Sequence, residues 1–148
     1  MSDDALDDDI ATRLRAADQR YTRGRRRLVA VLRDGEGPMT IQQVLDADRG
    51  LAQSSVYRNL AILEEVGAVT RIVTRDDFAR YELAEDLTEH HHHHLICEGC
   101  GDVSDFSLAP GVETELDRAL RAVARRTGFA ADGHRLDLLG RCASCQGG

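Results

Sequence analysis

The 148-residue sequence has no apolar run as long as a membrane-spanning helix needs. It also lacks a secretory signal at its start, because residues 1–9 carry five aspartates and neither a basic nor an apolar stretch. Apolar residues make up 42% of the chain, which is enough to bury a core and argues against disorder throughout. We therefore expect a folded cytoplasmic protein that does not associate with a membrane.

Positive charge is in short supply overall. The net charge of −7 argues against indiscriminate binding to nucleic acids. Its distribution is uneven, however, because residues 19–33 contain six arginines and no acidic residue. Binding to DNA through one defined surface is therefore compatible with the composition, since local charge decides such binding.

Residues 10–66 show the periodicity of short amphipathic helices separated by turn signals. The candidate helices cover residues 10–17, the residues after Thr22, the residues after Thr40, and the stretch that ends before Gly67. In the last of these, Val56, Leu60 and Leu63 recur at i, i+4 and i+7, which places them on one helical face. Thr22 is a good N-cap for the second helix.

A β-hairpin is expected next, because the β-prone residues 69–74 and 79–83 flank a polar turn. The last three of these helices followed by a hairpin are typical of a winged helix-turn-helix, whose later helix reads DNA. We predict this domain over residues 10–84, preceded by an acidic, mobile leader at residues 1–9.

Residues 85–89 form a polar connection, which we interpret as a hinge before a second domain at residues 90–148. Three strands are predicted in that domain, leading into Cys97, over residues 103–106 and over residues 134–139. A helix over residues 110–126 carries an apolar stripe formed by Val112, Leu116, Leu120 and Val123. The chain is therefore expected to be α+β, with a winged helix followed by a small α/β domain.

The four cysteines form two C-x-x-C pairs: Cys97 with Cys100, and Cys142 with Cys145. Tetrahedral zinc takes four soft ligands, and each pair supplies two of them. The separation between the pairs exceeds that of a simple zinc ribbon, so the fold must bring the second pair back to the first. The alternatives are a redox dithiol and cysteines that have no shared role. We predict a structural zinc site, because disulfides are rare in a reducing compartment.

The histidine tract at residues 90–94 runs directly into the strand that ends at Cys97. Side chains alternate along a strand, so His92 and His94 face one way and His91 and His93 the other. One strand could thus supply two metal sites, although a solvated polar strand is the alternative. Imidazole suits zinc, iron, manganese and nickel alike. Further candidate ligands are His134, Glu82, Asp105, Glu113 and Asp117.

Several motifs together resemble the ferric uptake regulator family. These motifs are residues 55–60 (SVYRNL), 80–83 (RYEL), 91–101 (HHHHLICEGCG) and 133–136 (GHRL), together with the second cysteine pair. The resemblance extends from Arg20 to Cys145. It implies a metal-dependent repressor that binds a palindromic double-stranded DNA operator as a homodimer, with the second domain providing dimerisation.

The resemblance also implies roles for individual residues. Cys97, Cys100, Cys142 and Cys145 match a structural zinc site. Glu82, His92 and His94 match a regulatory metal site at the hinge, with Asp105 as a ligand in some members. His91, His93 and His134 match an additional metal site, completed by either Glu113 or Asp117. The DNA-binding residues it implies are Arg20, Ser55, Tyr57 and Arg58.

The sequence departs from the family pattern at the regulatory site. The position that supplies a histidine from the DNA-binding domain in iron- and peroxide-type members lies near Pro38, and none stands there. Many zinc-type members have a cysteine where Glu82 stands. We favour Zn²⁺ slightly over Fe²⁺ as co-repressor, because the site lacks the extra histidine.

Three other functions are possible. The first is a peroxide-sensing repressor of the same family. The second is a metal buffer or carrier, which would leave Tyr57 and Arg58 without a role. The third is a zinc hydrolase, but the sequence lacks an HExxH motif, so we do not expect an enzyme.

Overall fold

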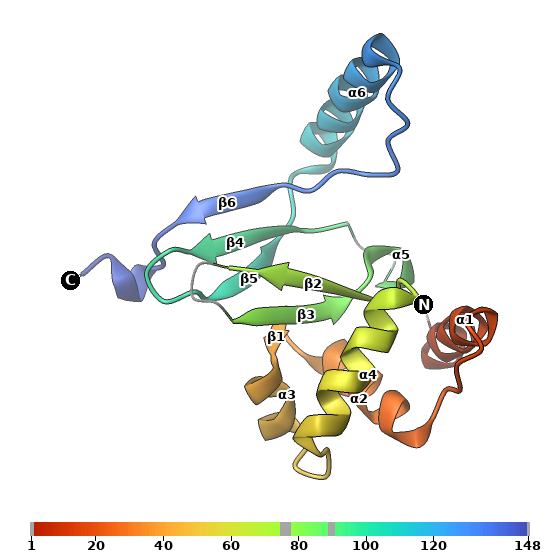
Figure 1. Cartoon of the computed structure of the whole chain (residues 1–148). Helices are drawn as coiled ribbons and strands as arrows, with labels where there is room; N and C mark the ends of the chain where they lie inside the picture. The colour runs from red at the N-terminus through yellow and green to blue at the C-terminus, as the bar shows by residue number, and fades with distance from the viewer. Residues whose placement is uncertain (1, 75–77, 89–90, 148) are drawn as a thin grey trace.

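The computed structural model of the protein describes residues 2–74, 78–88 and 91–147. The turn of the expected hairpin at residues 75–77, together with Glu89 of the expected hinge and His90 of the tract, lies outside these ranges. The elements are α1 (Asp3–Ala16), α2 (Arg23–Asp34), β1 (Met39–Thr40), α3 (Ile41–Ala47), α4 (Gln53–Glu65), β2 (Val69–Val73), β3 (Ala79–Leu83), α5 (Glu85–Thr88), β4 (His93–Cys97), β5 (Val103–Phe106), α6 (Pro110–Thr127) and β6 (Asp137–Gly140), followed by a 3-10 turn over Ala143–Cys145 (Figure 1). Among the described residues, no helix is long and apolar enough to cross a membrane.

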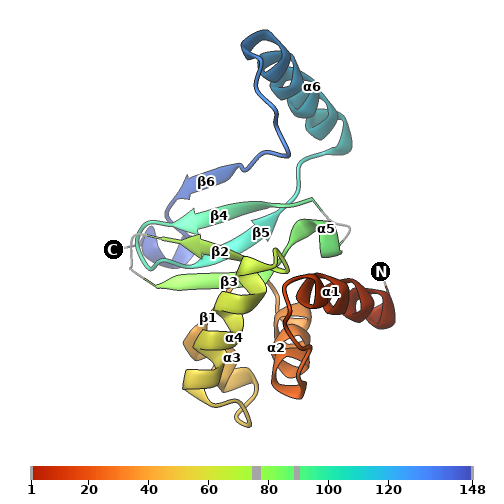
Figure 2. The same cartoon turned by 45° about the vertical axis from the view of Figure 1, so that its right-hand side comes forward.

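The N-terminal half, residues 2–88, has the winged-helix arrangement. Thr22 caps α2 by accepting a hydrogen bond from the Arg25 backbone N–H, and Thr40 forms a capping box with Gln43 at the start of α3. Helices α2, α3 and α4 lie on one side of a three-stranded antiparallel sheet of order β1-β3-β2 (Figure 2). The helices and hairpin predicted from periodicity are therefore confirmed, and β1 is an addition.

The expected mobile leader is wrong, because residues 3–9 belong to α1. Ser2 caps this helix, and Leu6, Ile10 and Leu14 recur on one face and are buried in the core. The five aspartates dominated the composition of this segment and concealed its apolar face. Helix α1 therefore begins well before residue 10 and packs as part of the N-terminal half.

The connection between the halves is also more ordered than a polar hinge. Residues 85–88 form one helical turn, α5, and Leu87 is buried within the N-terminal core. The described part of the connection is therefore anchored to the N-terminal half.

In the C-terminal half, strand β6 begins at Asp137, three residues later than predicted.

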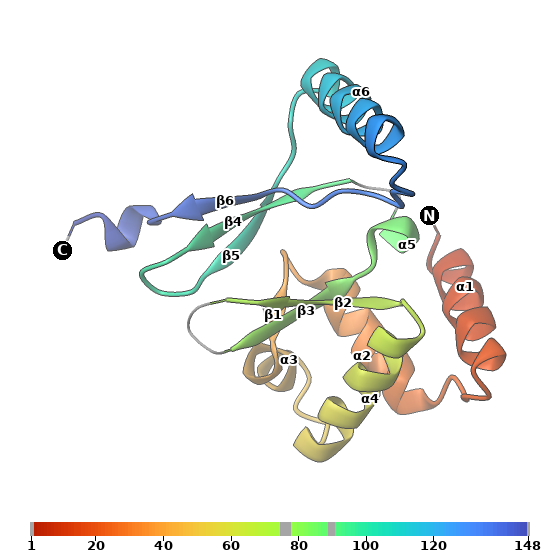
Figure 3. The ribbon, with the colours of Figure 1, turned by 45° about the horizontal axis from the view of Figure 1, so that its top comes forward.

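The C-terminal half, residues 91–147, contains a second sheet of order β5-β4-β6, in which β5 is antiparallel and β6 parallel to β4. Helix α6 projects away from the rest of the chain and buries none of its residues (Figures 1 and 3). The buried apolar residues described in this half are only Ile96, Cys97 and Val103. So small a core needs additional stabilisation from metal ligation or from a partner.

Candidate metal centres and nucleic-acid interface

Three groups of metal-binding side chains form in the structure. The cysteine cluster is Cys97, Cys100, Cys142 and Cys145; the junction cluster is Glu82, His92, His94 and Asp105; and the Glu113 cluster is His91, His93, Glu113 and His134. Within each group the candidate ligand atoms all lie within 4.8 Å of one another. These three groups contain every candidate metal ligand named from the sequence except Asp117.

The cysteine cluster forms where the hairpin turn after β4 meets the 3-10 turn after β6. The parallel pairing of β4 with β6 places Cys97 beside Gly140, which brings the second pair to the first. All four cysteines are free, and the Sγ atoms of Cys100 and Cys142 lie 3.8 Å apart. That separation matches the edge of a ZnS₄ tetrahedron, about 3.8 Å for Zn–S bonds of about 2.3 Å.

The electrostatics of the cysteine cluster also suit a cation. The Cys142 backbone N–H donates to Cys97 Sγ at 3.2 Å and, with the Cys100 N–H, lowers the pKa of the Cys97 thiol to about 6. Hydrogen bonding to the sulfurs of Cys142, Cys100 and Cys97 raises the pKa of Cys145 to about 12. Ionisation is therefore easiest at Cys97, and a cation is needed before all four cysteines can ionise together.

The junction cluster joins the two halves of the chain. Glu82 lies on β3 of the N-terminal half, and its two carboxylate oxygens lie 3.2 Å from His92 Nε2 and 2.9 Å from His94 Nε2. Asp105 stands opposite His94 in the β4–β5 register, with its carboxylate oxygens 3.8 Å from Nε2 of each histidine. Two imidazoles and two carboxylates therefore converge from β3, β5 and the start of β4.

This donor set fits a divalent cation. Burial, reinforced by the Glu82 carboxylate, raises the pKa of Asp105. Burial opposes protonation of His94, but its hydrogen bonds to Glu82 and Asp137 outweigh that effect and raise its pKa. A bound cation would relieve the repulsion between the buried Glu82 carboxylate and the more exposed Asp105 carboxylate. From the turn at residues 35–37, Gly37 approaches the Asp105 carboxylate, and a glycine adds no ligand side chain.

The Glu113 cluster lies on the opposite face of the same strand. Glu113 of α6 places Oε2 2.9 Å from His93 Nε2, and Oε1 3.1 and 3.3 Å from Nε2 of His91 and His134. Despite these short distances, the geometry gives Glu113 Oε1 no hydrogen-bond partner among the described residues, although the atom is buried, as expected of a cation ligand. Asp117 stands behind the cluster, 3.4 Å from His134 Nδ1, and does not join it.

Two carboxylates that the sequence did not single out contact the outer nitrogens of the tract histidines. Asp137 on β6 lies 3.3 Å from His94 Nδ1, and Glu85 on α5 lies 2.8 Å from His91 Nδ1. Such partners orient metal-binding histidines and fix which ring nitrogen carries the proton. No local sequence pattern marks either residue, since Asp137 comes beside His94 only through the parallel pairing of β6 with β4.

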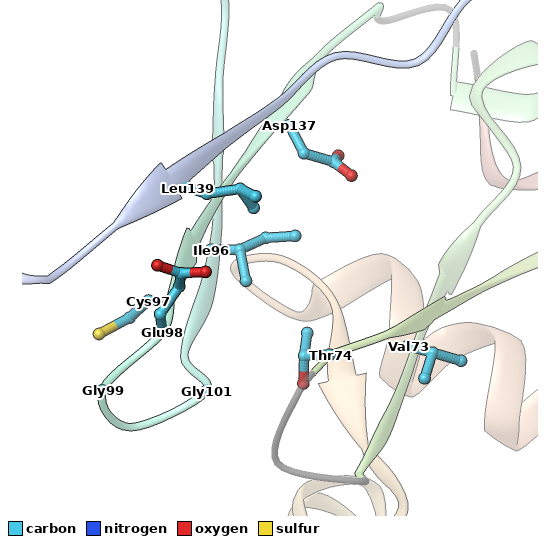
Figure 4. Close-up of a pocket in the computed structure, with 9 residues that line it drawn as sticks. All are labelled: Val73, Thr74, Ile96, Cys97, Glu98, Gly99, Gly101, Asp137 and Leu139. Carbon is cyan, nitrogen blue, oxygen red and sulfur yellow. The ribbon is translucent and has the colours of Figure 1, made fainter.

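A cavity of about 530 Å³ separates the halves near the cysteine-cluster end of β4. Figure 4 shows Val73 and Thr74 at the end of β2 on one side, and Ile96 and Leu139 of the second sheet on the other. Because the halves are not packed together at this end, their relative angle depends strongly on the contacts around the junction cluster.

The expected DNA-binding residues lie on or near the outer face of α4. The inner face buries Val56, Leu60 and Leu63, whereas Tyr57 is 55% exposed and Arg58 is exposed beside it. Ser55 is half-buried, and Arg20 is exposed just before α2. Within the described ranges, neither Arg20 nor Arg58 forms an ion pair, so both are available to phosphates or bases.

Arg25 was not predicted as functional, yet it is buried and ties these elements together. Its guanidinium donates to the Arg20 carbonyl oxygen, to Gln19 Oε1 at 3.2 Å and to Asn59 Oδ1 on α4 at 3.2 Å. Burial, together with the nearby Arg58 guanidinium, lowers the pKa of Arg25. It therefore fixes Arg20 relative to α4. The acid-free arginine run was a signal for the region but did not single out this residue.

Known proteins resemble this chain over nearly its whole length. The peroxide-responsive repressor PerR of Staphylococcus aureus is 30% identical over 145 residues, which cover 95% of this chain and 91% of that protein. A zinc-bound manganese uptake regulator is 31% identical and superposes with a TM-score of 0.61, covering 93% of this chain and 98% of the other. The Helicobacter pylori ferric uptake regulator Fur, 22% identical, shares the fold with a TM-score of 0.74 and covers 99% of this chain and 95% of its own.

The family model described as the ferric uptake regulator family matches residues 16–139, which include α2 to α6 and all three clusters except the second cysteine pair. The fold, a winged helix followed by a small α/β unit, agrees with this match. The chain thus belongs to the ferric uptake regulator family of dimeric, DNA-binding, metal-responsive transcription regulators, which are not enzymes.

Proposed function

We propose that this protein is a metal-activated repressor in which the junction cluster is the regulatory site. The observation that carries the proposal is the contact of Glu82, on the N-terminal half, with His92 and His94 on the C-terminal half. A cation held by these residues and Asp105 would fix the angle between the halves. Affinity for DNA would rise because the competent arrangement becomes more populated.

The other two clusters have supporting roles in this proposal. The cysteine cluster holds structural zinc and stabilises the small C-terminal half. The Glu113 cluster is an additional metal site completed by Glu113, since Asp117 stands behind His134. The Helicobacter pylori Fur structure, which reveals three functional metal binding sites, supports an assignment of three sites.

In this proposal the two halves have different functions, DNA binding and dimerisation. Residues 10–84, extended by α1, form the DNA-binding domain, in which Arg20, Ser55, Tyr57 and Arg58 contact a palindromic operator. Residues 90–148 form the dimerisation domain. The exposed apolar stripe on α6 supports this assignment, because Val112, Leu120 and Val123 are 54%, 38% and 44% exposed in the single chain. A homodimeric repressor of this kind would act in the cytoplasm.

Zn²⁺ is the proposed co-repressor ahead of Fe²⁺. The junction cluster offers four protein ligands of nitrogen and oxygen, which is the usual coordination number of zinc. The turn at residues 35–37 approaches the junction cluster with Gly37, which has no side chain that could bind the metal. A peroxide-sensing repressor is the second candidate, favoured by the 30% identity to PerR.

The test is operator binding by the full-length protein, measured by fluorescence anisotropy on a palindromic AT-rich duplex. The cysteine cluster keeps its zinc, and Zn²⁺, Fe²⁺ or Mn²⁺ is added separately under anaerobic conditions. We expect Zn²⁺ to raise affinity by about 5–150-fold, the usual range of allosteric coupling. If hydrogen peroxide releases DNA from the Fe²⁺-loaded protein but not from the Zn²⁺- or Mn²⁺-loaded protein, the peroxide-sensing repressor is favoured. An operator affinity that none of the three metals changes would refute metal activation.

A further inference from the structure

The Glu113 cluster has a contact outside its own half of the molecule. Its four ligand residues all belong to the C-terminal half. His91 points Nε2 into the cluster, 3.1 Å from both Glu113 Oε1 and His134 Nε2. Its other ring nitrogen, Nδ1, faces the opposite way and lies 2.8 Å from Glu85 Oε2. The two nitrogens of one imidazole therefore face a metal-binding group on one side and α5 on the other.

Helix α5 is held firmly by the N-terminal half. Leu87 is 1% exposed and packs in the core formed by α1 to α4. Asp86 forms an ion pair with Arg13 of α1, and Arg13 also donates to the Gly67 carbonyl oxygen at 2.6 Å. The views in Figures 1 and 3 place α5 close to both α1 and the start of β4. The carboxylate that contacts His91 is therefore positioned by the DNA-binding half.

We propose that Glu85 is a positioning residue for His91 and makes the Glu113 cluster a second site that senses the arrangement of the two halves. The Glu85 carboxylate accepts a hydrogen bond from the Nδ1–H of His91, which keeps the proton on Nδ1 and leaves Nε2 unprotonated and aimed at the cluster. Loss of such a partner typically costs about 10–100-fold in metal affinity. By thermodynamic linkage, metal binding at the cluster strengthens the contact between His91 and Glu85 of α5. Because α5 is packed against the DNA-binding half, that half is held more tightly to the C-terminal half.

The first test measures metal affinity without DNA. The experiment uses the full-length protein with zinc bound to its cysteines and with the substitution His92→Ala, which disables the junction cluster. Its Zn²⁺ affinity is then measured by competition with a chelator. Glu85→Gln should weaken Zn²⁺ binding at the remaining cluster by at least about tenfold. The matched control, Glu115→Gln, removes a carboxylate whose only ion pair within the described ranges is with Arg118, and it should not change Zn²⁺ affinity. An effect of Glu85→Gln no larger than that of the control would overturn the proposal.

A double-mutant cycle isolates the contact with His91. In a His91→Ala background, Glu85→Gln should have no further effect on Zn²⁺ affinity, because the imidazole that it positions is gone. An equal loss in both backgrounds would show that Glu85 acts by another route and would overturn the assignment.

The second test reports on the link between the halves. Hydrogen exchange at the α5 amides should slow when Zn²⁺ fills the Glu113 cluster, and Glu85→Gln should abolish this protection. If Zn²⁺ does not change exchange at the α5 amides in the protein that carries His92→Ala alone, the link between the cluster and α5 is refuted. The proposal rests on the proposed function only for its consequence at DNA. Because neither measurement involves DNA, its failure is distinguishable from failure of the repressor function.

Discussion

The Glu82 carboxylate lies 2.9 Å from Nε2 of His94, although the two residues belong to different halves of the chain. Glu82 is fixed in the middle of the wing by pairing with Thr70, and His94 is fixed in the second sheet between Asp105 and Asp137. Both side chains are buried. Neither can move far alone, so a change in their separation requires movement of one half against the other.

This relationship predicts that His92→Ala abolishes the activation of DNA binding that depends on the junction cluster, because the cation loses a ligand that joins the halves. Most of the activation of about 5–150-fold expected for the unmodified protein should disappear, and only the smaller contribution of the Glu113 cluster should remain. His91→Ala, on the opposite face of the strand, should have a smaller effect. Operator affinity with and without Zn²⁺ decides between them, with dimer and cysteine-bound zinc checked in each variant. Equal activation in His92→Ala and the unmodified protein would contradict the junction mechanism.

Replacing Cys97 tests the cysteine cluster. Cys97→Ser should release the structural zinc and destabilise the C-terminal half, because zinc ligation contributes on the order of 10 kcal/mol in small metal-dependent domains. Zinc per chain after dialysis and thermal unfolding measure the two effects. Ser144→Ala, an exposed position between the cysteines of the second pair, is the control. A folded Cys97→Ser protein with unchanged zinc would exclude the assignment.

The exposed face of α4 predicts a direct role for Arg58. Arg58→Ala should weaken operator binding by about 1–3 kcal/mol and relax sequence preference, as expected for loss of a base contact. Arg20→Ala should lower affinity for all sequences and reduce the slope of log K against log salt by about 1. Salt-dependent titrations measure both, and Arg118→Ala on α6 serves as the control. Binding that neither variant alters would show that DNA contacts another surface.

The unpartnered stripe on α6 predicts dimerisation through this helix. Leu120→Glu should convert dimers to monomers in sedimentation velocity, because the partner would bury an unpaired carboxylate. Arg121→Glu adds the same group one position away, outside the stripe, and should leave the dimer intact. If Leu120→Glu were still dimeric, the interface would have to lie elsewhere in the chain.

Helix α1 is expected to contribute to stability despite its acidic composition. Leu6→Ala should lower the free energy of unfolding by about 2–5 kcal/mol, as usual when a buried leucine is truncated. Asp4→Ala on the exposed face should change it by less than about 0.5 kcal/mol. Chemical denaturation compares the two, and similar effects would mean that α1 is not packed as described.

The sequence alone determined the features that depend on local spacing. The i, i+4, i+7 pattern of Val56, Leu60 and Leu63 was enough to predict α4 and its buried face, because helical geometry brings those positions together. The C-x-x-C spacing likewise predicts a two-ligand turn. Alternation along a strand separated His92 and His94 from His91 and His93, since neighbouring side chains must face opposite sides.

Tertiary structure alone decided which distant groups meet. Glu113 and Asp117 are one helical turn apart, and only the position of α6 relative to β4 places Glu113 in the cluster and Asp117 behind His134. The contact of Glu85 with His91 depends on Leu87 packing into the core, which a polar linker sequence does not reveal. The physical reason is that ligand sets form between segments far apart in the chain, whereas periodicity reports only on neighbours.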